Sequence, residues 1–119
     1  MDIINHNAGE TQIAEVISND LLIQCADDGL DLLGNLYYQG FDHVILHQKN
    51  IAPEFFDLKN KMAGDILQKF STYRVRLVIV GDYSGFSSKS LKDFIRESNR
   101  GKQVNFLNSV SEAMRVFLS

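Results

Sequence analysis

The sequence contains no tryptophan, one proline and one cysteine among its 119 residues. A lone cysteine, Cys25, excludes an internal disulfide and a thiolate metal site, and we expect it to be a small buried core residue. No apolar run approaches the ~20 residues that a membrane span requires. The first ten residues lack the basic and apolar segments of a signal peptide. These absences predict a cytoplasmic protein without a membrane partner.

An excess of basic residues is also lacking, since 12 Lys and Arg stand against 15 Asp and Glu, giving a net charge of −3. Binding to a phosphate backbone requires a concentrated basic surface, so we expect no nucleic-acid partner. One small basic cluster, Arg96, Asn99 and Arg100, falls at the predicted end of a helix, where basic side chains favour the helix dipole. We keep it as a secondary candidate patch for a partner.

The chain does contain a regular alternation of strand and helix signals. Val75–Val80 is an almost unbroken apolar run closed by Gly81, which is typical of a strand covered on both faces. His43–His47 is a second apolar run, and an amphipathic pattern lies between the two. Strand, helix and strand in that order predict a parallel pair in the middle of the sheet.

The remaining signals extend this unit in both directions. An N-terminal β-hairpin is predicted by residues 2–6 and 11–18, with Asn7 to Gly9 as the turn. Helix starts are predicted at Asp27 or Asp28, at Pro53, at Ser87 or Ser88, and at the capping box Ser109–Glu112. Gln103–Leu107 reads as a half-exposed edge strand, whereas Leu21–Gln24 could be a strand or a loop.

The predicted order is therefore β-β-α-β-α-β-α-β-α within a single α/β domain spanning residues 1–119. A mixed, mostly parallel β-sheet flanked by helices is the expected architecture. The strand order is left open. The clearest helical pattern runs from Pro53 to Phe70, with Asp57–Lys61 and Asp65–Lys69 as ion pairs on its outer side.

Ligands of open α/β sheets favour the carboxyl ends of the parallel strands, where helix N-termini also point. Phe55 and Phe56 are adjacent and would point about 100° apart on a helix, so one is available to a partner if both cannot be buried. The candidate binding surface at this edge comprises His47, Glu54, Phe55, Phe56, Asp57, Asp82, Tyr83, Ser84 and Lys89.

The sequence contains only weak signals for a catalytic site or a metal site. Ser84 or Ser88 with His47 and Asp82 supplies the residue types of a nucleophilic triad, but the G-x-S-x-G elbow is missing. Two histidines four apart on a strand, His43 and His47, lie roughly 13 Å apart, too far to share one ion. His6 has no evident partner. We therefore predict no catalytic residues, no metal and no cofactor.

Most of the chain resembles a bacterial family of unknown function, domain of unknown function 4180. The resemblance is carried by Asp31–Gly40, Pro53–Lys59, Gly64–Phe70, Tyr73–Leu77, Gly81-Asp82, Asp93–Ile95 and Ser98–Gly101. It implies a small bacterial cytoplasmic protein and brings no established activity.

The element order is also similar to that of the sulfate-transporter and anti-sigma-factor-antagonist (STAS) domain. That resemblance implies a module that binds partner proteins or small ligands without chemistry. Regulatory STAS members carry a phosphorylatable Ser or Thr near the start of the helix before the central strand. Residues 51–70 contain neither residue type, so the phosphorylation switch would be lost. Glu54 and Asp57 could place permanent negative charge there, and ordinary acids at a helix N-terminus would explain them equally well.

The favoured hypothesis is a non-catalytic binding or regulatory module for a protein partner or a small molecule. The alternative is a small hydrolase-type enzyme that uses Asp82 with His47 or Ser84. A homodimer formed through a sheet edge or a helix face is a third prediction, which size-exclusion chromatography would test.

Overall fold

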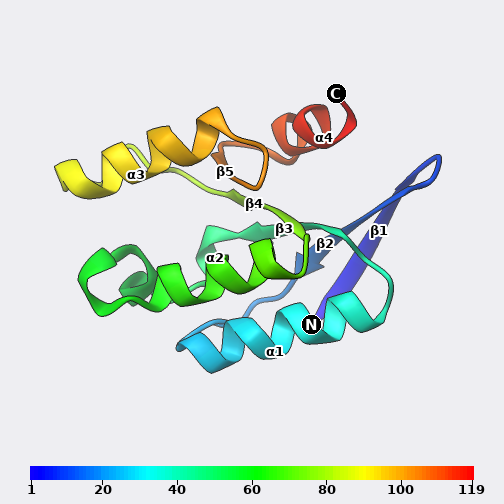
Figure 1. Ribbon diagram of the computed structural model, residues 1–119, viewed down its shortest axis with the longest axis horizontal. Coiled ribbons are helices and arrows are strands. Elements are labelled where there is room, and N and C mark those ends of the chain that lie inside the picture. Colours follow the sequence, from blue (N-terminus) through cyan, green and yellow to red (C-terminus); the bar gives the residue numbers. More distant parts are fainter.

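The parallel pair of β3 and β4 lies inside the sheet of the computed structural model, which describes all 119 residues (Figure 1). Strand β3 (His43–His47) pairs with β4 (Arg76–Val80) over its whole length, from His43 opposite Arg76 to His47 opposite Val80. On its other side β4 pairs, again in parallel, with β5 (Val104–Leu107). The prediction of an interior strand running in the direction of His43–His47 is confirmed.

The predicted N-terminal hairpin is also present. Strand β1 (Asp2–Ala8) runs antiparallel to β2 (Thr11–Ile17), and Gly9 provides the positive φ of 66° that the turn between them needs. Strand β2 pairs in parallel with β3, so the sheet has the order β1-β2-β3-β4-β5. The segment Leu21–Gln24 is a loop, in which Ile23 forms one isolated parallel β-bridge with Ile51.

Three helices cover one face of the sheet and the fourth covers the other. Helices α1 (Ala26–Tyr38), α2 (Met62–Thr72) and α3 (Lys89–Arg100) pack on a core of 22 buried residues that includes Val44, Leu77 and Ile79. Helix α4 (Val110–Leu118) packs on the opposite face and forms with it a second core of six buried residues, among them Ile45 and Val78 of the sheet and Phe117 of the helix. Figure 1 shows α4 apart from α1 and α2, with the hairpin extending beyond the helices.

The helix ends follow local side-chain chemistry. Ser88 accepts a hydrogen bond from the Leu91 N–H, and Ser109 accepts one from the Glu112 N–H, so both predicted caps are confirmed. Helix α1, by contrast, begins before the predicted Asp27 or Asp28. Its N-cap is Cys25, and the Asp28 carboxylate accepts from the Gln24 N–H instead.

The expectation that Cys25 is a core residue is wrong, because its side chain is exposed. The chain leaves the loop at this point to start α1, and the extended backbone of Cys25 (φ −153°) lies outside the buried face of the helix. That buried face is formed instead by Gly29, Leu32, Leu33 and Leu36.

The predicted helix from Pro53 to Phe70 is broken into three pieces. Two short 3₁₀ helices, η2 (Pro53–Phe56) and η3 (Leu58–Asn60), precede α2, and Lys61 adopts a left-handed φ of 66° between η3 and α2. The Asp57 carboxylate accepts from the Lys59 N–H, and the Asn60 amide donates to the Glu54 carbonyl.

These local bonds compete with the helical ladder, which explains the break. The predicted Asp57–Lys61 and Asp65–Lys69 ion pairs do not form, and the salt bridges of the protein lie at other residues, three of them between a histidine and a carboxylate. The left-handed backbone of Lys61 ends the helical spacing between Asp57 and Lys61.

Strand β5 is an edge strand, as predicted, but it is not half exposed. Val104, Asn105 and Phe106 are all buried, since α3 covers one face of the strand and α4 covers the other. No helix in the structure combines the length and the apolar character that crossing a bilayer would require.

Candidate functional site

The carboxyl ends of β3 and β4 form an edge with two adjoining hollows. The 3₁₀ helix η1 (Gln48–Asn50) follows β3, and the loop Gly81–Ser88 follows β4. The first hollow, about 560 Å³, is lined by Leu21, Gln48, Lys49, Ile51, Pro53, Phe56 and Phe86. We call it the Leu21 hollow. The second, about 520 Å³, is lined by Phe56, Asp57, Leu58, Lys59, Ser88 and Ser90, and we call it the Ser90 hollow.

Phe56 lines both hollows, although only 7% of the residue is exposed. Its ring centroid lies 5.0 Å from that of Phe55, 5.1 Å from that of Phe86 and 6.1 Å from that of Tyr83. Aromatic rings at these separations stabilise one another beyond their burial, so the wall shared by the two hollows is rigid. Phe55, at 1% exposure, lies in the core. Both rings are buried, so the condition under which one of them would be available to a partner is not met.

Tyr83 supports this aromatic cluster from the loop after β4. Its hydroxyl donates a hydrogen bond of 2.6 Å to the Ile79 carbonyl, and its ring meets Phe106 edge-on at 5.6 Å. Burial raises the pKa of the Tyr83 hydroxyl well above its ordinary range, so the phenol stays neutral. Tyr83 was predicted to bind a ligand. Its hydroxyl is instead bonded within the protein, so Tyr83 stabilises the site.

Gln48 links the two strand ends. Its side-chain carbonyl accepts a hydrogen bond of 2.9 Å from the Asp82 N–H. The side chain lies so close to the backbone of Gly81 that a Cβ there would lie 2.5 Å from Gln48 Cβ and would also collide with Oε1. Glycine at position 81 is therefore required for Gln48 to occupy this place, a dependence that no sequence pattern indicated.

Asp82 and Ser84 form a closed turn. The Asp82 carboxylate accepts a 2.7 Å hydrogen bond from the Ser84 hydroxyl and a 3.0 Å bond from the Ser84 N–H. These two bonds lower the pKa of the Asp82 carboxyl, which weakens it as a base. His47, the third member of the hydrolase hypothesis, hydrogen-bonds elsewhere, so no bond connects it to Asp82 or Ser84.

A buried carboxylate with two histidine partners was missed by sequence reasoning. Glu15 on β2 is only 7% exposed; its Oε1 lies 2.8 Å from His6 Nε2 on β1, and its Oε2 lies 2.7 Å from His47 Nε2 on β3. Burial would raise the pKa of the Glu15 carboxyl, but the hydrogen bonds from His47 and His6 bring it below its ordinary value. The statement that His6 lacks a partner is wrong.

One sequence signal could have indicated this cluster. Alternation along β2 puts Glu15 on the same face as the buried Ile13, and a buried carboxylate needs hydrogen-bonding partners. Choosing His6 and His47 requires the strand order and register, which the sequence left open. The three side chains are not arranged to hold a metal ion.

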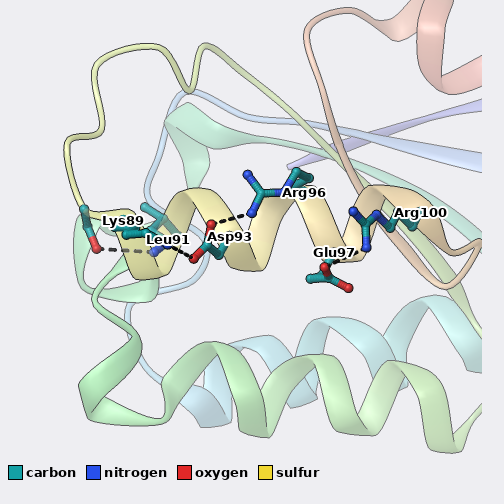
Figure 2. Close-up of polar contacts among 7 residues, drawn as sticks. Lys89, Leu91, Asp93, Arg96, Glu97 and Arg100 are labelled. Atoms are coloured by element: carbon teal, nitrogen blue, oxygen red, sulfur yellow. Dashed lines mark hydrogen bonds and ion pairs between the residues drawn. The ribbon is translucent and has the colours of Figure 1, made fainter.

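The other predicted residues lie around the hollows or away from them. Asp57 lines the Ser90 hollow, whereas Glu54 is exposed beside Pro53 and lines neither hollow. Lys89 forms an ion pair of 2.8 Å with Asp93 on the exposed side of α3 (Figure 2).

The charged residues of the secondary basic patch form ion pairs within α3. Arg96 pairs with Asp93 at 2.6 Å and Arg100 pairs with Glu97 at 2.9 Å, as Figure 2 shows. The Asn99 side chain donates to the Phe106 carbonyl and accepts from the Phe106 N–H, so it anchors β5. Because Asp93 also pairs with Lys89, two acids face three cations here, and α3 keeps a net positive charge.

A third depression, about 430 Å³, lies between α2 and α3. Leu67, Phe94 and Val104 provide its apolar surface, and Gly64 and Lys102 are among the residues that line it. Nothing lies within 4 Å of a Cβ built on Gly64, so this glycine mediates no close contact between helices.

Comparison with known proteins gives one match. No curated protein and no solved structure matches the chain significantly, so the STAS-like likeness stays a prediction that rests on element order. A family profile described as a domain of unknown function (DUF4180) matches residues 8–117. Because this match covers well over half of the chain, from the last residue of β1 into α4, the chain belongs to that family.

Proposed function

We propose that this protein is a non-catalytic binding module whose working surface is the edge that holds the Leu21 and Ser90 hollows. The observation that carries the proposal is the sharing of Phe56 by two adjoining hollows at the carboxyl ends of β3 and β4. Preformed hollows lined by apolar and aromatic side chains with a few polar groups are typical of ligand sites, and this edge is where α/β sheets favour ligands.

The polar groups of the surface favour binding over chemistry. Asp82 and Ser84 are bonded to each other, and His47 is bonded to Glu15 on the sheet face. A general base must reach the proton that it removes, and no such relay is formed here. A regulatory role in the cytoplasm is part of the same proposal. Residues 51–70 contain no Ser or Thr, so this role would not depend on phosphorylation of that segment.

The test is a fragment screen by two-dimensional NMR, with acidic, basic and neutral small molecules. We expect binding fragments to shift the amide signals of Gln48, Phe56 and Phe86. Bulky replacements at the exposed residues that line each hollow, Leu21→Trp and Ser90→Trp, should abolish binding in the corresponding hollow. Tyr38→Trp, a change at a side chain that is 93% exposed and outside both hollows, is the matched control.

Two results would overturn the proposal. One is a set of fragments that binds only elsewhere, for example between α2 and α3. The other is turnover of an ester substrate that the wild-type protein catalyses and Asp82→Asn loses, which would establish the hydrolase alternative.

A further inference from the structure

We infer that the Leu21 hollow binds a small molecule with an apolar body that ends in a single carboxylate, and that Lys49 and Gln48 bind the carboxylate. This inference rests on the proposed function, since it names the class of ligand for the same surface. It follows from the chemistry of the lining, from the orientation of one amide and from the charges beside the hollow.

The lining of the Leu21 hollow is apolar and contains no acid. Leu21, Ile51, Pro53, Phe56 and Phe86 provide its hydrophobic surface, and Gln48 and Lys49 are its only polar residues. Leu21 is 46% exposed, a large apolar side chain left partly in water next to the hollow. An apolar body that covers this surface would gain free energy from removing it from water.

Gln48, which lines the hollow, carries a hydrogen-bond donor that has no partner in the protein. Because the Asp82 N–H donates to one end of the Gln48 amide, that end is the carbonyl oxygen and the other end is the NH₂ group. No group of the protein accepts a hydrogen bond from this NH₂, since the bond with Asp82 is the only one that the side chain forms. Gly81 keeps the side chain in this place, so the donor is oriented before a ligand arrives.

Lys49 adds a positive charge next to that donor. It is exposed, lines the hollow and takes part in none of the six ion pairs of the protein. An ammonium group and an amide NH₂ are both donors, so they match a ligand group that only accepts hydrogen bonds and carries negative charge. A cationic ligand would be repelled by the Lys49 charge, and the lining contains no acid that would offset this repulsion.

The neighbouring acids limit the ligand to a low charge. Asp20 precedes Leu21, Glu54 follows Pro53, and Asp82 is bonded to Gln48. Asp20 and Glu54 are each next to a lining residue in the sequence, and Asp82 is bonded to one through its N–H, so their charges would repel a polyphosphate more strongly than a monoanion. A volume of about 560 Å³ lies within the range of about 300–1,000 Å³ that small-molecule sites occupy. The observations therefore favour a small apolar monocarboxylate.

The test compares three probes that share one apolar body: 3-phenylpropionate, 3-phenylpropionamide and 3-phenylpropylamine. Each is titrated at pH 7 and followed by the amide signals of Leu21, Gln48 and Phe86. We expect the acid to bind at least about threefold more tightly than the amide, as an exposed charge contact allows, and the amine to bind most weakly. Lys49→Gln should remove the preference for the acid and leave the affinity for the amide unchanged.

Lys92→Gln is the matched control, because Lys92 is also exposed and unpaired but lies on α3 outside the hollow; this variant should keep the preference for the acid. Equal affinities for all three probes at the hollow, or an acid preference that survives Lys49→Gln, would overturn the inference and leave the binding module standing. Tighter binding of a peptide with an acidic side chain beside an aromatic one would assign the surface to a protein partner instead.

Failure of all three probes separates the two proposals when it is read with the fragment screen. If other fragments still bind in the Leu21 hollow, only the ligand class is wrong. If no fragment binds in either hollow, the proposed function fails with it.

Discussion

His47 Nε2 lies 2.7 Å from Glu15 Oε2, a hydrogen bond that joins β3 to β2 across 32 residues of sequence. His6 Nε2 reaches the other oxygen of the same carboxylate at 2.8 Å from β1. One buried acid thus connects three neighbouring strands, on the face of the sheet that α4 covers over β3, β4 and β5. The stability of the outer hairpin should therefore depend on the charge of Glu15.

The pH dependence of unfolding tests this connection. Because the pKa of Glu15 is lowered in the folded protein, the folded state binds fewer protons than the unfolded state in acid. The contribution is fully present above the unfolded value of about 4.3 and is lost as the pH falls through the folded pKa. Glu15→Gln should lower the free energy of unfolding at pH 7 by about 1–3 kcal/mol, and the difference should shrink in acid.

Urea unfolding between pH 3 and pH 7 measures this difference. Glu97→Gln is the control, since Glu97 is exposed and pairs only with Arg100; its curve should follow that of the wild type. A constant difference between wild type and Glu15→Gln across the whole pH range would contradict the prediction.

Replacing a helical glycine by alanine should destabilise the protein at one position and stabilise it at two others. At Gly29 in α1, a Cβ would lie 2.6 Å from Ile66 Cδ1 in α2, so Gly29→Ala should destabilise the protein by forcing the helices apart. At Gly34 and Gly64 a Cβ would meet nothing within 4 Å. There alanine should stabilise the fold by up to about 1 kcal/mol each, because glycine is the poorer helix former. Thermal unfolding of the three variants checks this, and equal effects would refute it.

Asn99 should matter more than the charged residues beside it. Its side chain makes two hydrogen bonds with the backbone of Phe106, at 2.8 Å and 3.1 Å. Asn99→Ala should cost about 1–3 kcal/mol, because it leaves backbone groups of the edge strand unpaired. Arg96→Ala, which removes an exposed ion pair, should change stability by less than about 1 kcal/mol. Chemical denaturation of both variants measures these losses. A larger loss of stability in Arg96→Ala than in Asn99→Ala would show that β5 is anchored in another way.

Tyr83 should contribute stability that disappears in alkali. Burial raises the pKa of its hydroxyl in the folded protein, so above the ordinary value of about 10 the unfolded state releases a proton that the folded state retains. The contribution is complete below that pH and decreases as the pH rises above it. Tyr83→Phe should lose about 1 kcal/mol at pH 7 with the Ile79 hydrogen bond and should fall less steeply in alkali. Unfolding curves with the same alkaline slope would contradict this.

Much of the fold could be predicted because its signals are local. The apolar runs at His43–His47 and Val75–Val80 identify buried parallel strands, and Ser88 and Ser109 cap the helices that follow β4 and β5. The Pro53–Phe70 segment shows where local reading fails. Its apolar spacing is helical throughout, yet the side chains of Asp57 and Asn60 bind nearby backbone groups, and the helix starts only at Met62.

The site could be predicted only in part, because its contacts join distant segments. The strand-end edge was identified from the order of the elements, but the Leu21 hollow needs Leu21, Gln48 and Phe86 from three separate loops. The Glu15 cluster needs the register of β1 against β2. Cys25 was misplaced because a cysteine before a helix gives no sign of which way its side chain faces.

The two sides of the sheet are buried unequally, and we expect this difference to set the order in which the native state opens. Helix α4 adds two buried residues, Ala113 and Phe117, to its core of six, whereas α1, α2 and α3 share a core of 22. Segments with few buried apolar contacts open at a lower free energy than the rest of a protein. In native-state hydrogen exchange, the amides of α4 should therefore lose protection by sub-global opening while those of β3 and β4 exchange only on complete unfolding.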